Sequence, residues 1–360
     1  MRVTERDGVQ LHSYDLSDRL AHGWIEMHVA SRVKKARKKK NQDAEEKQSV
    51  TETSEIALED HPLSPLRYVR IDPHHLWLKN LRYRQPEWMW TRQLESDFEV
   101  IGQLDAIDGL ESVGTLSAIE TLFNALRDER IYYSVRQKAA RAIAKMSAEK
   151  TGWKGMHLLI DFFKDNYFLK DKTLPSVNDF SNFSLYFVLC AVISAVSEIK
   201  DEKGETPEDI LEFLSEILIH NDNSLNQFSD SRYLSTLISS LSNLSPKRES
   251  LQFSSLLQQV ERYLTRDTLL PSFQNIVAVA CLRAYGSLTR KSHAHVSTQF
   301  FSKFLKKGNF LNVRLEALHW IVSLRVDKYA ESAEKEKAAF SLMKCKTFFL
   351  HPFFFPSLIL

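Results

Sequence analysis

The twelve histidines are the first residues to test for chemistry, because a zinc-dependent peptidase needs two of them one helical turn apart. That arrangement is HExxH, with the glutamate as general base, and the sequence contains no such motif. His74 and His75 are neighbours in an expected turn, so their side chains diverge. His293 and His295 have no nearby carboxylate on the same helical face. We therefore predict surface or core roles for the histidines, and no catalytic, metal-binding or cofactor-binding residue.

Serine and cysteine nucleophiles are no better supported by their surroundings. Tyr285-Gly286-Ser287 lacks the GxSxG elbow of a hydrolase and is interpreted as a loosened helix end. Cys190, Cys281 and Cys345 are far apart, and they are expected to be core thiols in a reducing compartment. Glycine-rich phosphate loops of the GxxxxGK[ST] and GxGxxG types do not occur in the sequence. The sequence thus predicts a protein that is not an enzyme.

The strongest electrostatic feature is a basic run in the segment SRVKKARKKK. Its cationic side chains could direct nuclear import or contact DNA phosphates, which give affinity without reading the base sequence. The alternative is a solvated loop, neutralised in part by Asp43, Glu45 and Glu46. No aromatic residues are interleaved with the run, so stacking on bases is not indicated. The residues concerned are Arg32, Lys34, Lys35, Arg37, Lys38, Lys39 and Lys40.

Aromatic side chains gather at Trp77, Tyr83, Trp88 and Trp90. Such residues dominate the hot spots of protein interfaces, so the group could contact a partner. The alternative, which we favour, is that the group seals the junction between a β region and the first helix. Trp88 and Trp90 are two positions apart on an expected helix and therefore face different sides of it. The two indoles are not expected to be equally buried.

The composition is typical of a helical protein with a substantial core. Hydrophobic residues make up 43% of the chain, and 10 Gly and 10 Pro in 360 residues are few for a turn-rich all-β protein. The net charge is +2, so any basic surface must be local. The longest apolar helix, expected at 183–196, is shorter than the roughly 20 residues of a membrane span. We expect neither a membrane segment nor a secretion signal.

The order of patterns predicts a mainly α protein, with a HEAT- or armadillo-like α-solenoid preceded by a short β-sandwich remnant. Residues 1–80 are expected to contain strands, including a hairpin at Asp7-Gly8 and a strand at 24–29. The charged segment 31–65 interrupts them and buries too little apolar surface to fold. The solenoid is expected at 81–346.

Apolar residues recur at helical spacing along the solenoid, and helix pairs recur about every 35–50 residues, which is typical of such repeats. The expected helices lie near 86–109, 115–129, 134–148, 153–166, 181–199, 207–220, 229–244, 248–265, 271–288, 293–306, 311–326 and 330–346. Residues 347–360 form an atypical phenylalanine-rich tail, and our hypothesis is that it is an artefact of gene prediction.

The segment 66–110 carries a resemblance to a known family. Its motif residues are Arg70, Ile71, Asp72, Pro73, Trp77, Gln85, Pro86, Glu87, Met89, Trp90, Gln93 and Leu94. In these residues the chain resembles the TFIID subunit 2 family, TBP-associated factors with an aminopeptidase-like body. The resemblance weakens toward residue 330. It implies a fragment that covers the end of the β-sandwich and the helical repeats, with the catalytically silent peptidase-like part preceding Met1.

The resemblance also implies a function and a set of partners. The family takes part in core-promoter recognition and in assembly of the RNA polymerase II pre-initiation complex. This implies a nuclear, non-catalytic scaffold that binds other TFIID subunits: the histone-fold TBP-associated factor subunit 8, the largest subunit and, indirectly, TBP, together with promoter DNA. The alternative is the helical capping region of an M1-type zinc aminopeptidase, which shares the order of sandwich and solenoid. A generic HEAT-type scaffold is disfavoured by the N-terminal strands.

Overall fold

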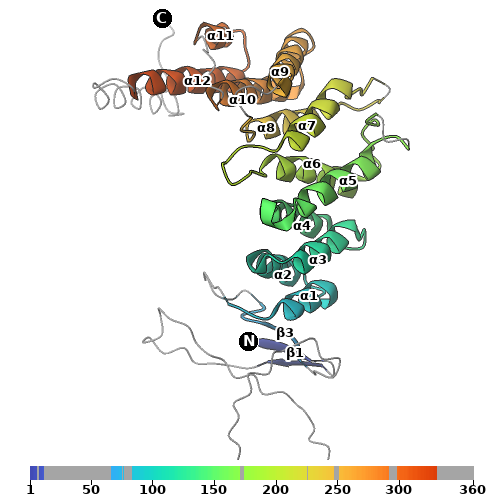
Figure 1. Ribbon diagram of the computed structural model, residues 1–360. Coiled ribbons are helices and arrows are strands. Elements are labelled where there is room, and N and C mark those ends of the chain that lie inside the picture. The colour runs from blue at the N-terminus through green and yellow to red at the C-terminus, as the bar shows by residue number, and fades with distance from the viewer. Residues whose placement is uncertain are drawn as a thin grey trace, which may run out of the picture. The chain divides into compact units, whose positions relative to one another are not determined.

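The computed structural model describes residues 1–5, 8–11, 66–74, 76, 83–170, 174–224, 226–246, 251–291 and 298–330. Within these ranges the chain forms a small sheet followed by a succession of helices (Figure 1). Several predicted features lie outside them. These are the strand at 24–29, the insertion at 31–65 with its basic run, Trp77, His75, His293, His295, the last expected helix at 330–346 beyond Ala330, and the tail.

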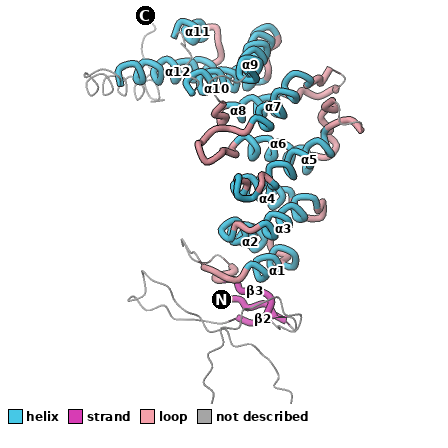
Figure 2. The backbone as a smooth tube through the Cα atoms, viewed as in Figure 1, coloured by secondary structure: helices cyan, strands magenta, loops and turns pink. Residues whose placement is uncertain are grey.

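Three short antiparallel strands form one sheet in the order β2-β1-β3 (Figure 2). They are β1 (Arg2–Glu5), β2 (Gly8–Leu11) and β3 (Leu66–Arg70). The predicted hairpin is confirmed, because β1 and β2 pair from Arg2 opposite Leu11 to Glu5 opposite Gly8. On the other side, β1 pairs with β3, which follows much later in the sequence. Alternate residues of β1 are buried, as expected for a strand with one face on a core.

The helices begin directly after Pro86, a residue that costs little at a helix start because its missing N–H has no partner there. Their bounds are α1 (Glu87–Ser96), α2 (Val100–Val113), α3 (Leu116–Arg127), α4 (Tyr133–Met146), α5 (Lys154–Tyr167), α6 (Phe183–Ser197), α7 (Glu208–His220), α8 (Ser231–Leu241), α9 (Leu251–Leu269), α10 (Ile276–Lys291), α11 (Thr298–Ser302) and α12 (Leu311–Ala330), with 3₁₀ turns at Glu149–Thr151, Phe273–Asn275 and Lys303–Leu305.

The single helix predicted at 86–109 is wrong, because it is two helices separated by residues 97–99. Asp97 and Glu99 have extended backbone angles, with ψ of 128° and 124°. Their carboxylates turn back toward the end of β3, and the helical hydrogen bonding is interrupted where they do so. The break thus coincides with contacts between segments that are distant in sequence.

The chain divides into two compact units, Met1–Ala142 and Ile143–Leu360, whose boundary falls within α4. In the first unit, α1, α2 and α3 pack on one another, and α1 also packs on β3. In the second unit, helices pack on the helix two places later: α6 on α8, α8 on α10, α10 on α12, and α7 on α9. This alternation is the packing of a two-layered repeat protein, in which each helix pair is covered by the next. The predicted class of fold, helical repeats after a short β region, is confirmed.

Gly286 corrects another interpretation, since it lies in the middle of α10 rather than at a loosened helix end. A methyl group at this position would lie 2.2 Å from the indole of Trp320 on α12. The absence of a side chain therefore lets the Trp320 ring lie flat on α10. The helix continues past this glycine and ends at Lys291.

Candidate domain-junction site

Several of the described residues that carried the family resemblance meet where β3 ends and the helices begin. Arg70 is the last residue of β3, and only 1% of its side chain is exposed. Its Nη1 atom donates hydrogen bonds to Asp97 Oδ2 at 3.2 Å and to Glu99 Oε2 at 2.6 Å. Its Nη2 atom donates to the Pro73 carbonyl at 3.5 Å. One arginine thus connects the strand, the turn after it and the break between α1 and α2.

Glu99 joins two arginines that would otherwise repel each other. Arg2 on β1 lies directly opposite Arg70 on β3, and like charges in this position destabilise a strand pair. The second carboxylate oxygen of Glu99 accepts a hydrogen bond from Arg2 at 2.7 Å. The hydrogen bond from Arg70, followed by that from Arg2 and the charges of both, lowers the pKa of Glu99 although partial burial acts in the opposite direction. The carboxylate is therefore ionised at neutral pH and fastens the strand pair to the helices.

The pKa of Arg70 is raised, with two opposed causes. Burial alone would lower it, but the hydrogen bond to Glu99 and the charges of Asp97 and Glu99 outweigh the desolvation. Its Nε atom is buried without a hydrogen-bond partner. Removing one member of a buried ion pair leaves the other uncompensated, which typically costs about 3–5 kcal/mol. Arg70 is accordingly the residue on which this site depends most.

A chain of amide hydrogen bonds runs beside the ionic cluster. The Val69 N–H donates to Gln85 Oε1 at 3.3 Å, and Gln85 Nε2 donates to Gln93 Oε1 at 3.1 Å. Gln93, which is fully buried, donates from Nε2 to the Gly102 carbonyl at 2.8 Å. These bonds connect β3, α1 and α2 in sequence. They also satisfy polar groups whose burial without partners would be costly.

Trp90 closes the hydrophobic side of the junction. It is 3% exposed, and its ring centroid lies 5.1 Å from that of Tyr83. A methyl group on Gly109 would lie 2.2 Å from the indole, so this glycine lets α2 approach the ring. Gly102 lies seven residues earlier and leaves room for the carboxylate of Asp97. A methyl group at this position would lie 2.2 Å from Asp97 Oδ2. Both glycines are needed for close approach and neither has a positive φ.

Trp88 and Trp90 differ in burial, as their spacing predicts. Trp90 is buried, whereas Trp88 is half-buried, and the Nε1 atom of Trp88 finds no hydrogen-bond partner. Trp77 and the basic run lie outside the described residues. The roles suggested for these residues, in a domain junction, in partner contact, in nuclear import or in DNA contact, stay predictions.

Sequence reasoning missed Asp97, Glu99, Gly102 and Gly109. A signal for the glycines was present, because two glycines seven residues apart fall on the same face of a helix. The carboxylates carried no such signal, since charged residues at the end of a helix are ordinarily solvated. Their partners on β1 and β3 are far away in the sequence, and only the folded chain brings them together.

Two cysteines lie among the described residues, Cys190 and Cys281. Burial raises the pKa of the Cys190 thiol to about 12 and raises that of Cys281 as well, so neither thiol is a ready nucleophile. No three His, Cys, Asp or Glu side chains in the described ranges gather into a set suited to a metal ion. Of the helices that the structure describes, none combines the length and hydrophobicity needed to cross a bilayer.

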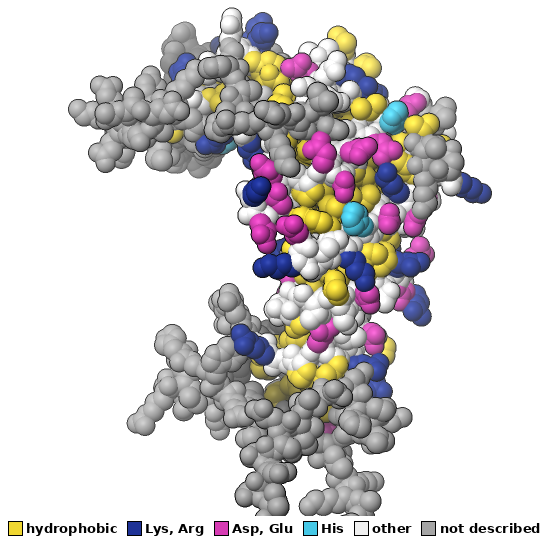
Figure 3. All heavy atoms as spheres, in the orientation of Figure 1, with side chains coloured by type: hydrophobic (Ala, Val, Ile, Leu, Met, Phe, Trp, Pro, Cys, Tyr) yellow, Lys and Arg dark blue, Asp and Glu magenta, His cyan; other side chains and the backbone are white. Residues whose placement is uncertain are grey.

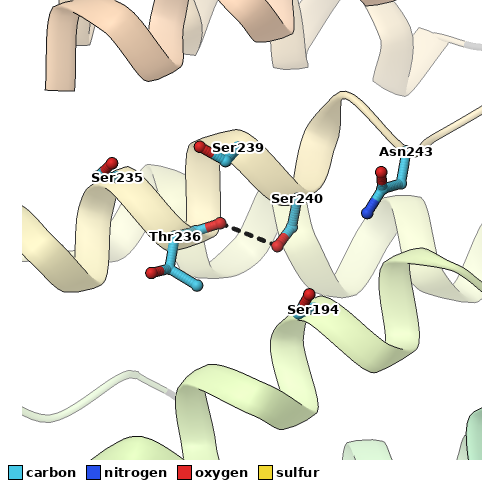
Figure 4. A pocket seen from close by; sticks show the side chains of 6 residues that line it. All are labelled: Ser194, Ser235, Thr236, Ser239, Ser240 and Asn243. Carbon is cyan, nitrogen blue, oxygen red and sulfur yellow. Dashed lines mark hydrogen bonds between the residues drawn. The ribbon is translucent and has the colours of Figure 1, made fainter. Parts of the chain in front are cut away.

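A polar cavity of about 250 Å³ lies between α6 and α8 (Figure 4). Ser194 projects from α6, and the other lining residues are Ser235, Thr236, Ser239, Ser240 and Asn243. The Ser240 hydroxyl donates to the Thr236 carbonyl at 2.9 Å. All of the lining groups are neutral, so the cavity offers hydrogen bonds but no acid, base or charge.

Charged side chains are interspersed on the face shown in Figure 3. Acidic, basic and hydrophobic side chains all occur there over the described helices, and several acidic side chains lie close together in the upper half of the view. Ion pairs also occur among the described helices, for example Lys164 with Glu216 at 2.9 Å and Arg283 with Glu316 at 3.0 Å.

The fold and the junction together define a class of protein: a β domain attached to helical repeats, with its most distinctive polar residues engaged in packing. Comparison with known families agrees with this. A family model described as "TAF2 Ig-like domain" matches residues 1–86, and one described as "TAF2-like, TPR repeats" matches residues 87–340. The chain belongs to the TAF2 family. The two matches meet at Pro86-Glu87, at the start of α1.

Curated relatives give the same result. The chain is 33% identical to transcription initiation factor TFIID subunit 2 of Schizosaccharomyces pombe over 277 residues, which covers 73% of the chain and 24% of the relative. It is 28% identical to the protein of the same name from Danio rerio and 27% identical to that from Drosophila melanogaster, covering 91% and 93% of the chain and 28% of each relative. The chain thus spans about a quarter of the length of these relatives.

The family model names the repeats TPR, whereas the sequence pattern suggested HEAT or armadillo repeats. Both are stacks of paired helices, so the class of fold is the same. The predicted boundaries at residues 80 and 346 stay predictions.

Proposed function

We propose that this chain is a non-catalytic scaffold segment of the general transcription factor TFIID that contributes to core-promoter recognition and to assembly of the RNA polymerase II pre-initiation complex. The relatives bear the name of TFIID subunit 2, and the two family models together cover residues 1–340. A scaffold needs its parts held in a defined arrangement rather than a reactive centre.

The observation that carries this proposal is the way in which the family's motif residues are used. Arg70, Gln85 and Gln93 make hydrogen bonds that join the strands to the first helices, and Trp90 packs against the glycine of the second helix. The partners in all of these hydrogen bonds are groups of the chain itself. The motif therefore serves to fasten a β domain to helical repeats.

We extend the proposal to partners and location. The partners are other TFIID subunits, among them the histone-fold TBP-associated factor subunit 8, the largest subunit and, indirectly, TBP. Promoter DNA is a further proposed contact, and the proposed location is the nucleus. The basic run from Arg32 to Lys40 would serve as the import signal or contact DNA phosphates.

Affinity purification of the tagged 360-residue chain from nuclear extract, followed by mass spectrometry, tests the proposal. We expect TBP and histone-fold TBP-associated factors with the wild-type chain, and less of both with Arg70→Ala. Lys138→Ala, which removes only a partly exposed ion pair with Asp108, should recover as much as the wild type. Recovery of none of these factors would overturn the proposal.

Location has a separate test. Replacing the seven basic residues with glutamine in a fluorescently labelled chain should move the label from nucleus to cytoplasm if the run is an import signal. An unchanged distribution would overturn that role.

A further inference from the structure

The second unit contains a long stretch of sequence with no acidic residue. Neither Asp nor Glu occurs from Thr268 to Leu315, although the whole chain contains 46 of them in 360 residues. The same stretch contains seven Lys and Arg residues. This part of the chain therefore has a local excess of positive charge that the overall net charge of +2 does not reveal.

Four of the seven cations form no ion pair with another residue that the structure describes. Arg283 pairs with Glu316 at 3.0 Å, Lys291 donates to two carbonyl groups at the end of α8, and Arg290 also has a partner. Arg314 is half-buried, and its Nε atom has no hydrogen-bond partner. The other three are exposed, and they are Lys303, Lys306 and Lys307.

Exposed apolar side chains lie in the same stretch. Leu269 at the end of α9 and Leu270 after it are 76% and 74% exposed, and Phe273 on the 3₁₀ turn before α10 is 76% exposed. Phe310 and Leu311, at the start of α12, are 41% and 57% exposed. Single exposed apolar residues are common, but several together mark places where a protein binds something.

The packing of α10 and α12 brings these residues together. The two helices run side by side in the same direction, because Arg283 pairs with Glu316 and a methyl group on Gly286 would meet the ring of Trp320. The starts of the two helices are therefore level, and the 3₁₀ turn before α10 lies against α12 (Figure 1). We call this surface the α10–α12 patch. Its members are the five exposed apolar residues and the four cations without an ion pair.

Hydrogen bonds hold both loops that carry the patch. Asp267 is 3% exposed, and its carboxylate accepts the Ser272 N–H at 2.8 Å and the Ala278 N–H at 3.0 Å. Asn309 Nδ2 donates to the Phe304 carbonyl at 2.9 Å and holds the turn before α12. The loops are thus preorganised, which reduces the entropy lost when a ligand binds.

The other acidic residues of α9 and α12 near the patch leave its charge in place. Glu316 is paired with Arg283 and accepts a hydrogen bond from the Trp320 indole. Glu261 is eight residues before Leu269 on α9, which is about 12 Å along a helix. Neither carboxylate lies at the end of the helices where the exposed apolar side chains are found.

The start of α8, which packs on α10, adds no excess of either sign. Asp230 is buried there and Arg232 is exposed, so one charge of each sign is present. Asp222, in the loop before α8, has a lowered pKa, caused first by hydrogen bonds from Ser224 and last by the charge of Arg266 on α9. Arg266 therefore faces a carboxylate, and we do not count it in the patch.

The composition of the patch favours one kind of ligand. Cations beside apolar side chains attract carboxylates, and complementary charge increases the rate and the specificity of association. The start of α12 adds the partial positive charge of a helix N-terminus. Three of the five apolar side chains are leucines, which offer no ring on which a nucleobase could stack. The patch therefore suits a peptide that is both acidic and apolar better than it suits a nucleic acid.

We propose that the α10–α12 patch binds an acidic segment of a partner protein that also carries large apolar side chains. Carboxylates of the segment pair with the four cations, and its apolar side chains pack on Leu269, Leu270 and Phe273. The inference does not depend on the proposed role in transcription, because it concerns only charge and exposure at this surface.

Fluorescence anisotropy of a labelled dodecapeptide that repeats Glu-Glu-Leu-Leu, titrated with the 360-residue chain, tests the proposal. We expect saturable binding that weakens with added salt, because salt screens exposed charges. A dodecapeptide that repeats Glu-Glu-Ser-Ser lacks the apolar side chains, and one that repeats Lys-Lys-Leu-Leu has the opposite charge. Each of these two should bind about tenfold more weakly or not at all.

Two double variants assign the binding to the patch. Leu269→Ser/Leu270→Ser removes apolar side chains, Lys306→Gln/Lys307→Gln removes charge, and each should weaken binding of the acidic peptide about tenfold. All four side chains are exposed, so circular dichroism should show the helix content of the wild type in both variants. If one variant loses helix, the other still tests the proposal.

Control variants exclude effects from elsewhere on the chain. Leu116→Ser and Lys203→Gln change exposed residues outside the patch and should bind like the wild type. The basic run from Arg32 to Lys40 would also attract an acidic peptide. All titrations are therefore repeated with the seven basic residues of that run replaced by glutamine, and the peptide should still bind.

Several outcomes would overturn the proposal. One is failure of the wild-type chain to bind the acidic peptide, or loss of all binding when the basic run is replaced. Another is binding by a correctly folded double variant that equals binding by the wild type. Binding to vesicles that contain phosphatidylserine, lost in the double variants and found in place of peptide binding, would assign the patch to an anionic lipid surface instead.

Discussion

The junction and a region of the second unit that we call the aromatic surface both contain aromatic rings and side-chain amides. The rings of the aromatic surface are Phe180, Phe183, Tyr186, Phe187 and Phe228. The two regions differ in what those side chains contact. At the junction, Trp90 is buried against Gly109, and Gln93 has both ends of its amide bonded within the protein. At the aromatic surface, asparagines bond to the backbone of loops, and the rings of Phe183 and Phe228 face solvent. The difference shows that aromatic content alone does not distinguish a sealed contact from an exposed one. The sealed contact at the junction is marked instead by a glycine on the neighbouring helix, which leaves room for the ring, and by a buried ion pair.

The largest effect should come from Arg70→Ala. The substitution leaves Asp97 buried without its cation and removes one of the two arginines that Glu99 joins, so we expect the free energy of unfolding to fall by about 3–5 kcal/mol. Urea denaturation followed by tryptophan fluorescence would measure the change. Lys138→Ala, which breaks a more exposed pair in the same unit, should cost less than about 1 kcal/mol. Equal losses in the two variants would contradict the importance assigned to the junction.

A smaller loss is expected from Gly109→Ala. Alanine favours a helix over glycine by about 0.5–1 kcal/mol, yet the new methyl group would press on the Trp90 indole. Overpacking of this kind costs about 1–3 kcal/mol, so the melting temperature should fall and the tryptophan emission should shift. Gly308→Ala is the matched control, since nothing lies within 4 Å of the added atom. A more stable Gly109→Ala variant would show that α2 can move away from the ring.

Acid should weaken the junction through Glu99. Its pKa in the folded protein is lowered from the ordinary value of a glutamate, so its stabilising effect is complete above that ordinary value and is lost as the pH falls through the folded pKa. We expect the melting temperature to fall more between pH 5 and pH 3 for the wild type than for Glu99→Gln. Because the side chain is 44% exposed, the difference should be smaller than the effect of Arg70→Ala. Identical acid dependence in both proteins would contradict the assignment.

The smallest effect on stability should come from the aromatic surface. Phe183→Ser and Phe228→Ser replace exposed rings, so each should change the free energy of unfolding by no more than about 0.5 kcal/mol. Urea denaturation under the conditions used for Arg70→Ala gives the direct comparison. A loss above about 1.5 kcal/mol would mean that the rings are part of the core and would remove the contrast between the two regions.

Local patterns were sufficient to predict much of the fold. Asp7-Gly8 indicated the hairpin, and the helical spacing of apolar residues indicated most helices of the second unit. The same reasoning failed at residues 97–99, where a periodic apolar pattern continues through a break in the chain. The partner of Asp97 is Arg70, 27 residues earlier, and no local pattern reports a contact over that distance.

The candidate sites show the same division. The motif around Arg70 and Gln85-Pro86-Glu87 was visible in the sequence and led to the junction. The aromatic surface was not predicted, because the loops that form it are far apart in the sequence. They are joined by a hydrogen bond between Asn226 and Asn178, which are 48 residues apart. Its rings come from three segments, each of which alone resembles an ordinary helix start or loop.

By itself the sequence determined the order of a β region and helical repeats, the helical periodicity and the family motif, because these depend on neighbouring residues and their spacing. The tertiary structure alone decided which charged side chains are buried, which glycines leave space for an aromatic ring of a neighbouring helix, and which aromatic side chains stay exposed. These outcomes depend on the approach of segments that are remote along the chain. The burial of a side chain is a property of its neighbours in space, and the chain acquires those neighbours only when it folds.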